Sequence, residues 1–295
     1  MKITVHIALL LTLLFARASS VSACTIFFVS DGTLALAGSN EDWADPNTQM
    51  WFVPATKGNY GIVYFGFGRG DYPPGGVSRH KLKIPDGGIA KINPEDLYGL
   101  PQGGMNEMGL FFDGASTDVV KAVPARGKQE YDGRLEDLIL RKCATVKEVV
   151  TLLETYAFNS VQGQWLFADK TGDSIVIEAG EVMVRKKGNY QVITNFLQSR
   201  TTAEDVTCQR YKLVSKSLAE VSDLSIDSAR SLLRATAQKS TIYSTIFDLT
   251  RGEVYIHYRA DFDRSVKISL ESELKNGERA VKISSLFEKA KQGHD

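Results

Sequence analysis

The chain has 295 residues, and its 35 lysines and arginines balance its 35 aspartates and glutamates, so that the formal net charge is zero. This balance argues against a nucleic-acid-binding surface and against a polybasic contact with a membrane. Hydrophobic residues make up 43% and charged residues 24%, as in ordinary globular proteins. Three cysteines (Cys24, Cys143 and Cys208) are too few for a disulfide-dense scaffold, and whether the last two pair is left open.

The first 23 residues have the pattern of a secretion signal. Lys2 supplies a positive start, residues 5–15 form a short apolar run, and residues 21–23 are the small residues of a cleavage site. The run is too short to cross a bilayer, which needs about 20 apolar residues. We therefore expect a signal peptide at residues 1–23, a single domain at residues 24–295, no membrane span, and a secreted or periplasmic location.

Cleavage after Ala23 would place a thiol and a free α-amine on one residue, Cys24. An α-amine titrates near ~7.7–8.0, so a fraction of it is neutral at pH 7 and can take the thiol proton. Cys24 is then a nucleophile that carries its own base. Two other interpretations stay open: a buried structural cysteine, or a lipidated one, because Val-Ser-Ala-Cys also fits a bacterial lipoprotein signal.

Two apolar runs at residues 25–29 and 34–38 flank a turn signal at residues 30–33, which predicts a hairpin. The hairpin would return residues 40–42 to the neighbourhood of Cys24. A carboxylate there could bind the α-ammonium group. The competing interpretation is a loop with a helix-capping aspartate.

The remaining elements follow in chain order. The pattern predicts strands, a long loop and helices, with a capping box at the start of the second helix. These are strands at 51–54 and 61–67, a loop at 69–101, a turn and strand at 103–114, helices at 135–141 and from 145, a hairpin at 165–178, a strand at 192–195, a helix from 225, a strand at 241–248 and a hairpin at 247–255. After Asp261 the chain becomes charged, and a loop at 272–279 precedes a final short strand or helix. This order favours an α+β fold with two stacked antiparallel sheets and helices outside.

Several of these segments together resemble a known family. They are Cys24-Thr25, Asn40-Glu41-Asp42 and Gly103–Gly114, followed by residues 165–178, 192–195 and 241–244. In order and spacing they are similar to the linear amide C–N hydrolases, the choloylglycine hydrolase and penicillin V acylase family of the N-terminal-nucleophile (Ntn) superfamily. The resemblance extends to about Tyr258. It implies a four-layer αββα sandwich and a reaction that needs no cofactor.

The resemblance also implies roles for individual residues. Cys24 would attack an amide carbonyl to give an acyl-thioester, and Asp42 would hold the α-amine. Asn195 would point its amide at the oxyanion, and Arg210 would lie near the nucleophile, where a cation lowers a thiol pKa. The implied catalytic residues are Cys24, Asp42, Asn195 and Arg210, and the implied substrate-binding residues are Asn40 and Ser116.

Two positions depart from the family pattern. Ser39 stands where bile-salt-type members carry an arginine, and Ser116 stands where many members carry an oxyanion asparagine. The first change removes a charge beside the nucleophile, and the second leaves a hydroxyl or a backbone N–H as the donor. These departures argue against the bile-salt subgroup and leave amide cleavage by Cys24 intact.

Three hypotheses follow. The first is a hydrolase of a linear, non-peptide N-acyl amide, with a small-molecule substrate. The second is an acyltransferase that uses the same acyl-enzyme, and the third is a lipid-anchored binding protein with a capped Cys24. The four histidines are scattered and no zinc spacing is present, so no metal or cofactor is expected. A homo-oligomer is left open.

Overall fold

The structure is a computed structural model that describes residues 24–43, 47–67, 100–121 and 127–288. The expected signal peptide lies outside the described residues. So does the expected loop at residues 69–101, except that residues 100 and 101 begin a strand.

The first sheet contains the hairpin with which the described chain begins. Its strands are antiparallel, in the order β10-β1-β2-β11-β12-β13. Their bounds are β10 Tyr190–Ile193, β1 Thr25–Ser30, β2 Ala35–Asp42, β11 Thr241–Asp248, β12 Glu253–Tyr258 and β13 Asp261–Ser269. The expected hairpin is confirmed, and its turn is closed by Asp31, whose carboxylate accepts from the backbone N–H groups of Thr33 and Leu34.

The second sheet has the order β14-β3-β4-β5-β6-β7-β8-β9 and is also antiparallel throughout. Its strands are β14 Arg279–Lys282, β3 Thr48–Val53, β4 Ile62–Phe67, β5 Leu100–Asn106, β6 Leu110–Ala115, β7 Gln164–Asp169, β8 Ser174–Glu178 and β9 Val182–Arg185. The expected strands and the hairpin at residues 165–178 are therefore confirmed.

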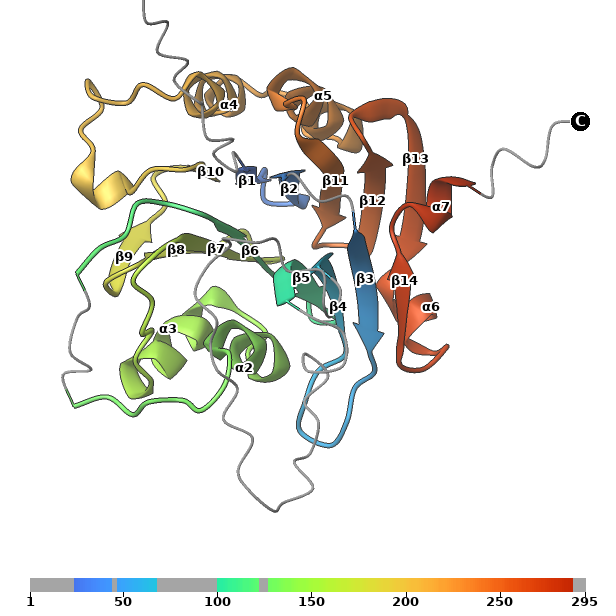
Figure 1. Ribbon diagram of the computed structural model, residues 1–295, viewed down its shortest axis with the longest axis horizontal. Helices are drawn as coiled ribbons and strands as arrows, with labels where there is room; N and C mark the ends of the chain where they lie inside the picture. Colours follow the sequence, from blue (N-terminus) through green and yellow to red (C-terminus); the bar gives the residue numbers. More distant parts are fainter. Residues whose placement is uncertain (1–23, 44–46, 68–99, 122–126, 289–295) are drawn as a thin grey trace, which may run out of the picture.

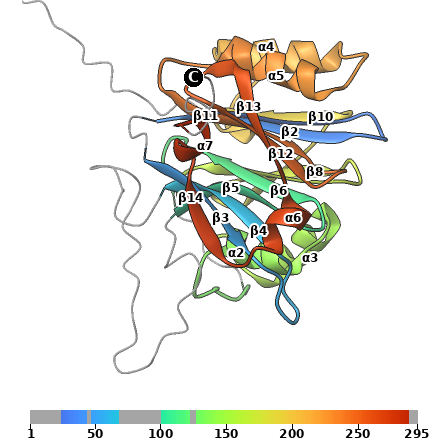
Figure 2. The same ribbon diagram turned by 90° about the vertical axis from the view of Figure 1, so that its right-hand side faces the viewer.

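Helices cover the outer face of each sheet (Figure 1). The pair α2 (Leu135–Lys142) and α3 (Val146–Thr155) packs on the second sheet, and the pair α4 (Gln209–Ala219) and α5 (Ile226–Thr236) packs on the first. Figure 2 shows the four layers edge-on. The expected αββα sandwich is confirmed.

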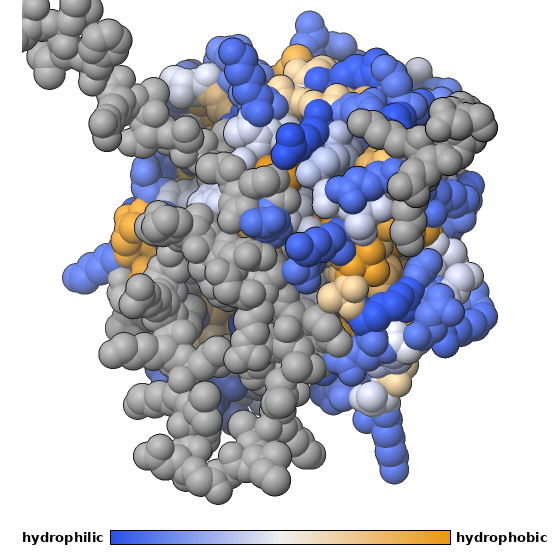
Figure 3. Space-filling view, turned by 45° about the vertical axis from the view of Figure 1, so that its right-hand side comes forward, coloured by the Kyte–Doolittle hydropathy of each residue, from blue (hydrophilic) through white to orange (hydrophobic). Residues whose placement is uncertain are grey.

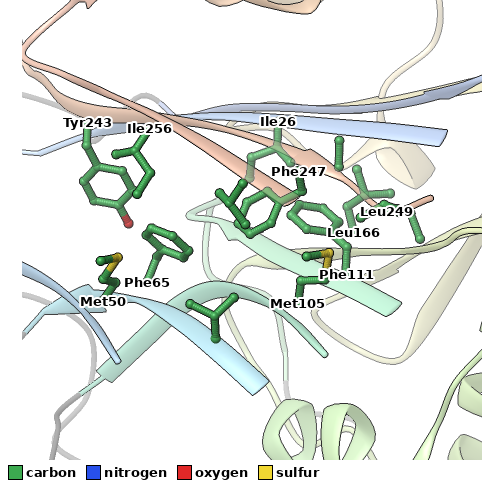
Figure 4. Close-up of a cluster of buried hydrophobic side chains, with 14 of the residues drawn as sticks. Ile26, Met50, Phe65, Met105, Phe111, Leu166, Tyr243, Phe247, Leu249 and Ile256 are labelled. Carbon is green, nitrogen blue, oxygen red and sulfur yellow. The ribbon is translucent and has the colours of Figure 1, made fainter. Parts of the chain in front are cut away.

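Three cores hold these layers together. Between the sheets, Phe247 packs against Phe65 and Phe111, with ring centroids 5.5 and 5.0 Å away, as part of a larger apolar cluster (Figure 4). On the two outer faces the helices bury one side each, such as Val146, Val149 and Leu153 of α3. Because alternate strand residues face the inner core and an outer core, both sheets are buried on both faces.

The helix starts follow from sequence. Thr145 and Glu148 form a capping box, in which each side chain accepts a hydrogen bond from the other residue's backbone N–H. Ser225 and Ser228 do the same at the start of α5. The expected helices at residues 135–141, from 145 and from 225 are confirmed, and each cap fixes the register in which the apolar side meets its sheet.

The C-terminal part differs from the expectation. Residues 261–269 form β13, a strand that the charged sequence there does not predict, because this edge strand buries little more than Phe262 and Ile268. The expected loop at residues 272–279 is wrong at its start, since α6 spans Leu270–Leu274. The chain then reaches the second sheet as β14 and ends its described part with α7 (Ser285–Glu288).

The face in Figure 3 is mostly hydrophilic where it is coloured, with hydrophobic side chains showing between polar ones. Among the described residues, no helix combines the length and the apolar character needed to cross a membrane.

Candidate active site

The candidate site lies where β1 begins. Thr25 pairs with Asn40 and Ile26 with Ser39 across the hairpin, and the same register places Cys24 level with Glu41. On the other side of β2, Glu41 pairs with Tyr243 of β11. Cys24 is 4% exposed and belongs to the core between the sheets. The sequence therefore delivers the thiol to the inner face of the sheet, at the residue directly before β1.

Arg210, in the first turn of α4, holds the backbone at this point. Its guanidinium Nη1 donates to the carbonyl oxygen of Cys24 at 2.6 Å and to Thr25 Oγ1 at 2.6 Å. Its Nη2 donates to Asn195 Oδ1 at 3.1 Å. One planar guanidinium thus ties the first residues of β1 to the segment that follows β10.

Asn195 and Ser116 are neighbours. Asn195 Nδ2 donates to the backbone carbonyl of Ser116 at 2.9 Å, while its Oδ1 is held by Arg210. The side-chain amide is therefore fixed at both ends. The hydroxyl of Ser116 lies 3.5 Å from Gln162 Nε2. Four of the residues named from sequence, Cys24, Arg210, Asn195 and Ser116, form one connected network.

Asp42 is buried at the end of β2, where the hydroxyl of Thr241 donates to its carboxylate. Burial raises the pKa of Asp42 to about 6, although the hydrogen bond from Thr241 and the positive charge of Arg210 both act to lower it. Its backbone N–H also hydrogen-bonds the Cys24 thiol. Asp42 therefore lies beside the residue that cleavage would make the N-terminus.

Asn40 points to the opposite face of the sheet. Its Nδ2 donates to Leu233 O at 3.0 Å and to Thr236 Oγ1 at 3.1 Å, both in α5, and its Oδ1 accepts from Ser244 at 2.6 Å. The side chain is fully buried. These contacts anchor α5 on the sheet, and the role of Asn40 in substrate binding stays a prediction.

Two further carboxyls face the thiol from the inner faces of both sheets. Glu41 accepts a hydrogen bond from the Cys24 thiol. Asp113, on β6 of the second sheet, accepts the backbone N–H of Gly114 at 2.7 Å and interacts with the hydroxyl of Ser39. Both carboxyls are almost fully buried, at 2% and 5% exposure.

Burial dominates the electrostatics of this group. It raises the pKa of Asp113 to about 7, with the interactions of Ser39 and Gly114 acting in the opposite direction. Burial, followed by the charges of Asp113 and Asp42, raises the pKa of Glu41 well above its usual value. Burial, followed by the charges of Glu41, Asp113 and Cys24, raises the pKa of Tyr243. A cluster of groups with shifted pKa values in a buried site is typical of functional sites.

We expected Arg210 to lower the pKa of the Cys24 thiol, but in the structure this pKa is raised. Burial raises that pKa first, and the charges of Glu41, Asp42 and Asp113 raise it further, against the hydrogen bond from the Asp42 backbone. Arg210 donates to the carbonyl oxygen of Cys24. The thiol therefore stays protonated at neutral pH, and its reaction needs a proton acceptor in contact with it.

Cys143 and Cys208 lie in opposite helical layers, at the end of α2 and at the start of α4, and both are free. Among the described residues, no group of three or more histidine, cysteine, aspartate or glutamate side chains is placed to hold a metal ion.

Sequence reasoning missed Glu41 and Asp113 as site residues. For Glu41 the signal was present, because extending the hairpin register by one pair places it opposite Cys24. For Asp113 the signal was an isolated acid within the apolar strand Leu110–Ala115. Its proximity to Cys24 depends on how the two sheets stack, which no local pattern contains.

The fold has counterparts among solved structures. A variant of conjugated bile acid hydrolase from Clostridium perfringens superimposes with a TM-score of 0.58 at 17% identity, over 88% of this chain and 97% of that one. A second variant of the same hydrolase gives 0.57 at 16% identity, over 88% and 96%. Penicillin V acylase from Agrobacterium tumefaciens gives 0.52 at 17% identity, over 80% and 82%. No family model and no curated protein matches the sequence. The expected resemblance to these hydrolases is thus confirmed in the fold.

Proposed function

We propose that this protein is an amidase that cleaves a linear, non-peptide N-acyl bond through Cys24, after export and removal of residues 1–23. The observation that carries the proposal is the guanidinium of Arg210, which joins Cys24 O, Thr25 Oγ1 and Asn195 Oδ1 at the start of β1. The fold shared with a conjugated bile acid hydrolase and a penicillin V acylase supports the same reaction class.

Each residue has a role in this proposal. The α-amine of Cys24, held by Asp42, takes the thiol proton while the sulfur attacks the amide carbonyl. Asn195 donates one N–H to Ser116 O, and its second N–H is assigned to the carbonyl oxygen as it becomes an oxyanion. Such a donor contributes about 2.7–4 kcal/mol to the transition state. The α-ammonium returns its proton to the leaving amine, and water releases the acyl group from the thioester.

The test begins with the mass of the exported protein, which should correspond to a chain that starts at Cys24. This protein is then assayed on penicillin V, a glycine-conjugated bile acid and N-acyl-4-nitroanilides of increasing acyl length. Cys24→Ala should lose activity by about 10⁴-fold or more, as removal of a nucleophile does. Cys208→Ala is the matched control, because this half-exposed thiol lies outside the network, and it should keep full activity.

The other hypotheses are outcomes of the same experiment. A retained residue 23, or an active Cys24→Ala variant, would contradict the proposal. A fatty-acid label on Cys24 would identify a lipid-anchored protein, because the α-amine would be blocked. Acyl-amine product in the presence of an added amine acceptor would identify an acyltransferase.

A further inference from the structure

Glu41 is the side chain that the reaction described above does not use, although it contacts the nucleophile. It lies level with Cys24 across the hairpin and accepts the hydrogen bond of the thiol. Its neighbour on the other side, Tyr243, belongs to β11. Glu41 is thus held between the strand that carries the thiol and the strand behind it, and both contacts face the space between the sheets.

The charged and titratable groups around Glu41 come from every element packed against it. They are Cys24 at the start of β1, Asp42 on its own strand, Asp113 on β6 and Tyr243 on β11, with Arg210 of α4 acting on Asp42. Within the described residues, neither Glu41 nor Asp113 forms an ion pair. The positive charge that enters this group on maturation is therefore the α-ammonium of Cys24 itself.

We propose that Glu41 is a second proton acceptor for the Cys24 thiol, which works when the α-amine is protonated and so extends catalysis into the acidic range. The inference rests on the proposed function, since it concerns the same nucleophile. It adds a catalytic residue that contacts the reacting sulfur.

In this mechanism Glu41 carries the proton from the thiol to the leaving group. As the sulfur bonds to the substrate carbonyl carbon, the S–H proton passes to the Glu41 carboxylate and the carbonyl π electrons move to oxygen. When the intermediate collapses, the C–N bond breaks and the Glu41 carboxylic acid gives its proton to the leaving nitrogen. In the second half, Glu41 takes a proton from the attacking water and returns it to sulfur as the C–S bond breaks.

The two acceptors are coupled through their charges. A protonated α-amine beside Glu41 favours the carboxylate, because an opposite charge within a few ångströms lowers a carboxyl pKa. The ammonium thus opposes the burial and the neighbouring charges that raise the pKa of Glu41, and the carboxylate that it stabilises accepts the proton in the pH range in which the amine is occupied. Above the titration of the amine, near ~8, the amine itself accepts the proton.

The test uses the mature protein and 4-nitrophenyl acetate, with acetylation of Cys24 followed by peptide mass spectrometry. Because 4-nitrophenolate leaves without a proton, the rate reports proton removal from the thiol alone. Glu41→Gln keeps the shape of the side chain but cannot accept the proton. It should acetylate about 100-fold more slowly than the wild type near pH 5.5 and within about threefold of it near pH 8.5. Glu41→Asp should recover part of the loss near pH 5.5.

Glu148→Gln is the matched control, since glutamine also completes a capping box, and this exposed residue of α3 lies in the outer layer. It should follow the wild-type profile at both pH values. A Glu41→Gln rate that is unchanged near pH 5.5, or reduced equally at both pH values, would overturn the inference. Neither result would touch the proposed amidase, whose failure shows instead as an unprocessed Cys24 or an active Cys24→Ala variant.

Discussion

Polar residues alternate between the two faces of β2, and their surroundings on the two faces are opposite in kind. On the outer face, Asn40 has hydrogen-bond partners in α5 and β11 at 2.6–3.1 Å. On the inner face, Ser39 and Glu41 meet Asp113, and two carboxyls share a buried space without a cation among the described residues. On the outer face the polar side chain has its hydrogen-bond partners. On the inner face two carboxyls are buried beside a thiol, and their ionisation there costs free energy. That contrast separates a structural polar residue from a reactive one.

The largest expected effect on the free energy of unfolding comes from removing the buried carboxyl of Asp113 from the inner face. The pKa of Asp113 is raised to about 7 from 3.8, so the folded state binds more protons than the unfolded state between these values. Stability must therefore fall as pH rises from about 4 to about 7, by up to about 4 kcal/mol for this one group. Asp113→Asn removes that dependence.

Urea denaturation of Cys24→Ala, with and without Asp113→Asn, measures this effect without interference from titration of the Cys24 thiol. The gain in the free energy of unfolding from Asp113→Asn should be near zero at about pH 4 and should be complete above about pH 8. A gain that is the same at both pH values would mean that Asp113 is not buried with a raised pKa.

A smaller effect of opposite sign on the free energy of unfolding is expected from removing the hydrogen bonds of Asn40 on the outer face. Asn40→Ala leaves Leu233 O and the hydroxyl of Ser244 without their partner, so it should cost about 3 kcal/mol of unfolding free energy. This loss should not change between pH 5 and pH 8, since none of these groups titrates there. Urea denaturation at the two pH values measures this loss. A loss that depends on pH would mean that Asn40 interacts with the titrating residues of the inner face.

The sequence was sufficient to predict the helices of the outer layers and part of the candidate site. Asp31 closes the first hairpin and Thr145 caps α3 through local contacts, so short-range patterns predicted both. Arg210 reaches Cys24 from 186 residues away, and only the family resemblance placed it near the nucleophile.

The remaining parts depend on distant contacts. Asp113 meets Glu41 because two sheets stack, and the edge strand β13 forms because β12 offers it partners, with Lys267 pairing to Glu253 at 2.7 Å. Neither follows from periodicity, since most residues of β13 are polar or half-exposed. The raised thiol pKa was missed for the same reason.

Gly103 gives a third and more moderate test, because it faces Asp113 across the β5–β6 pair. A Cβ at this position would lie 2.6 Å from Asp113 Oδ2, too close for any real contact. Gly103→Ala should therefore cost about 2 kcal/mol of unfolding free energy, as overpacking does. In the Asp113→Ala background the clash with the carboxyl is gone and a tight approach to Phe112 O remains, so a double-mutant cycle should show a coupling of about 1 kcal/mol or more between the two positions. Additive losses would mean that the carboxyl does not lie over Gly103.

The smallest effect is expected from Ser39→Ala, one residue before Asn40 and on the opposite face. The Ser39 hydroxyl acts to lower the pKa of Asp113. Its loss should raise that pKa while changing the free energy of unfolding near pH 4 by less than about 1 kcal/mol. The pH at which stability stops falling should therefore move upward relative to Cys24→Ala alone. A loss comparable to that of Asn40→Ala would remove the distinction between the two faces, because Ser39 would then be as structural as its neighbour. A shift of the pH dependence with little loss of stability would instead fit an inner face organised around the protonation of Glu41 and Asp113.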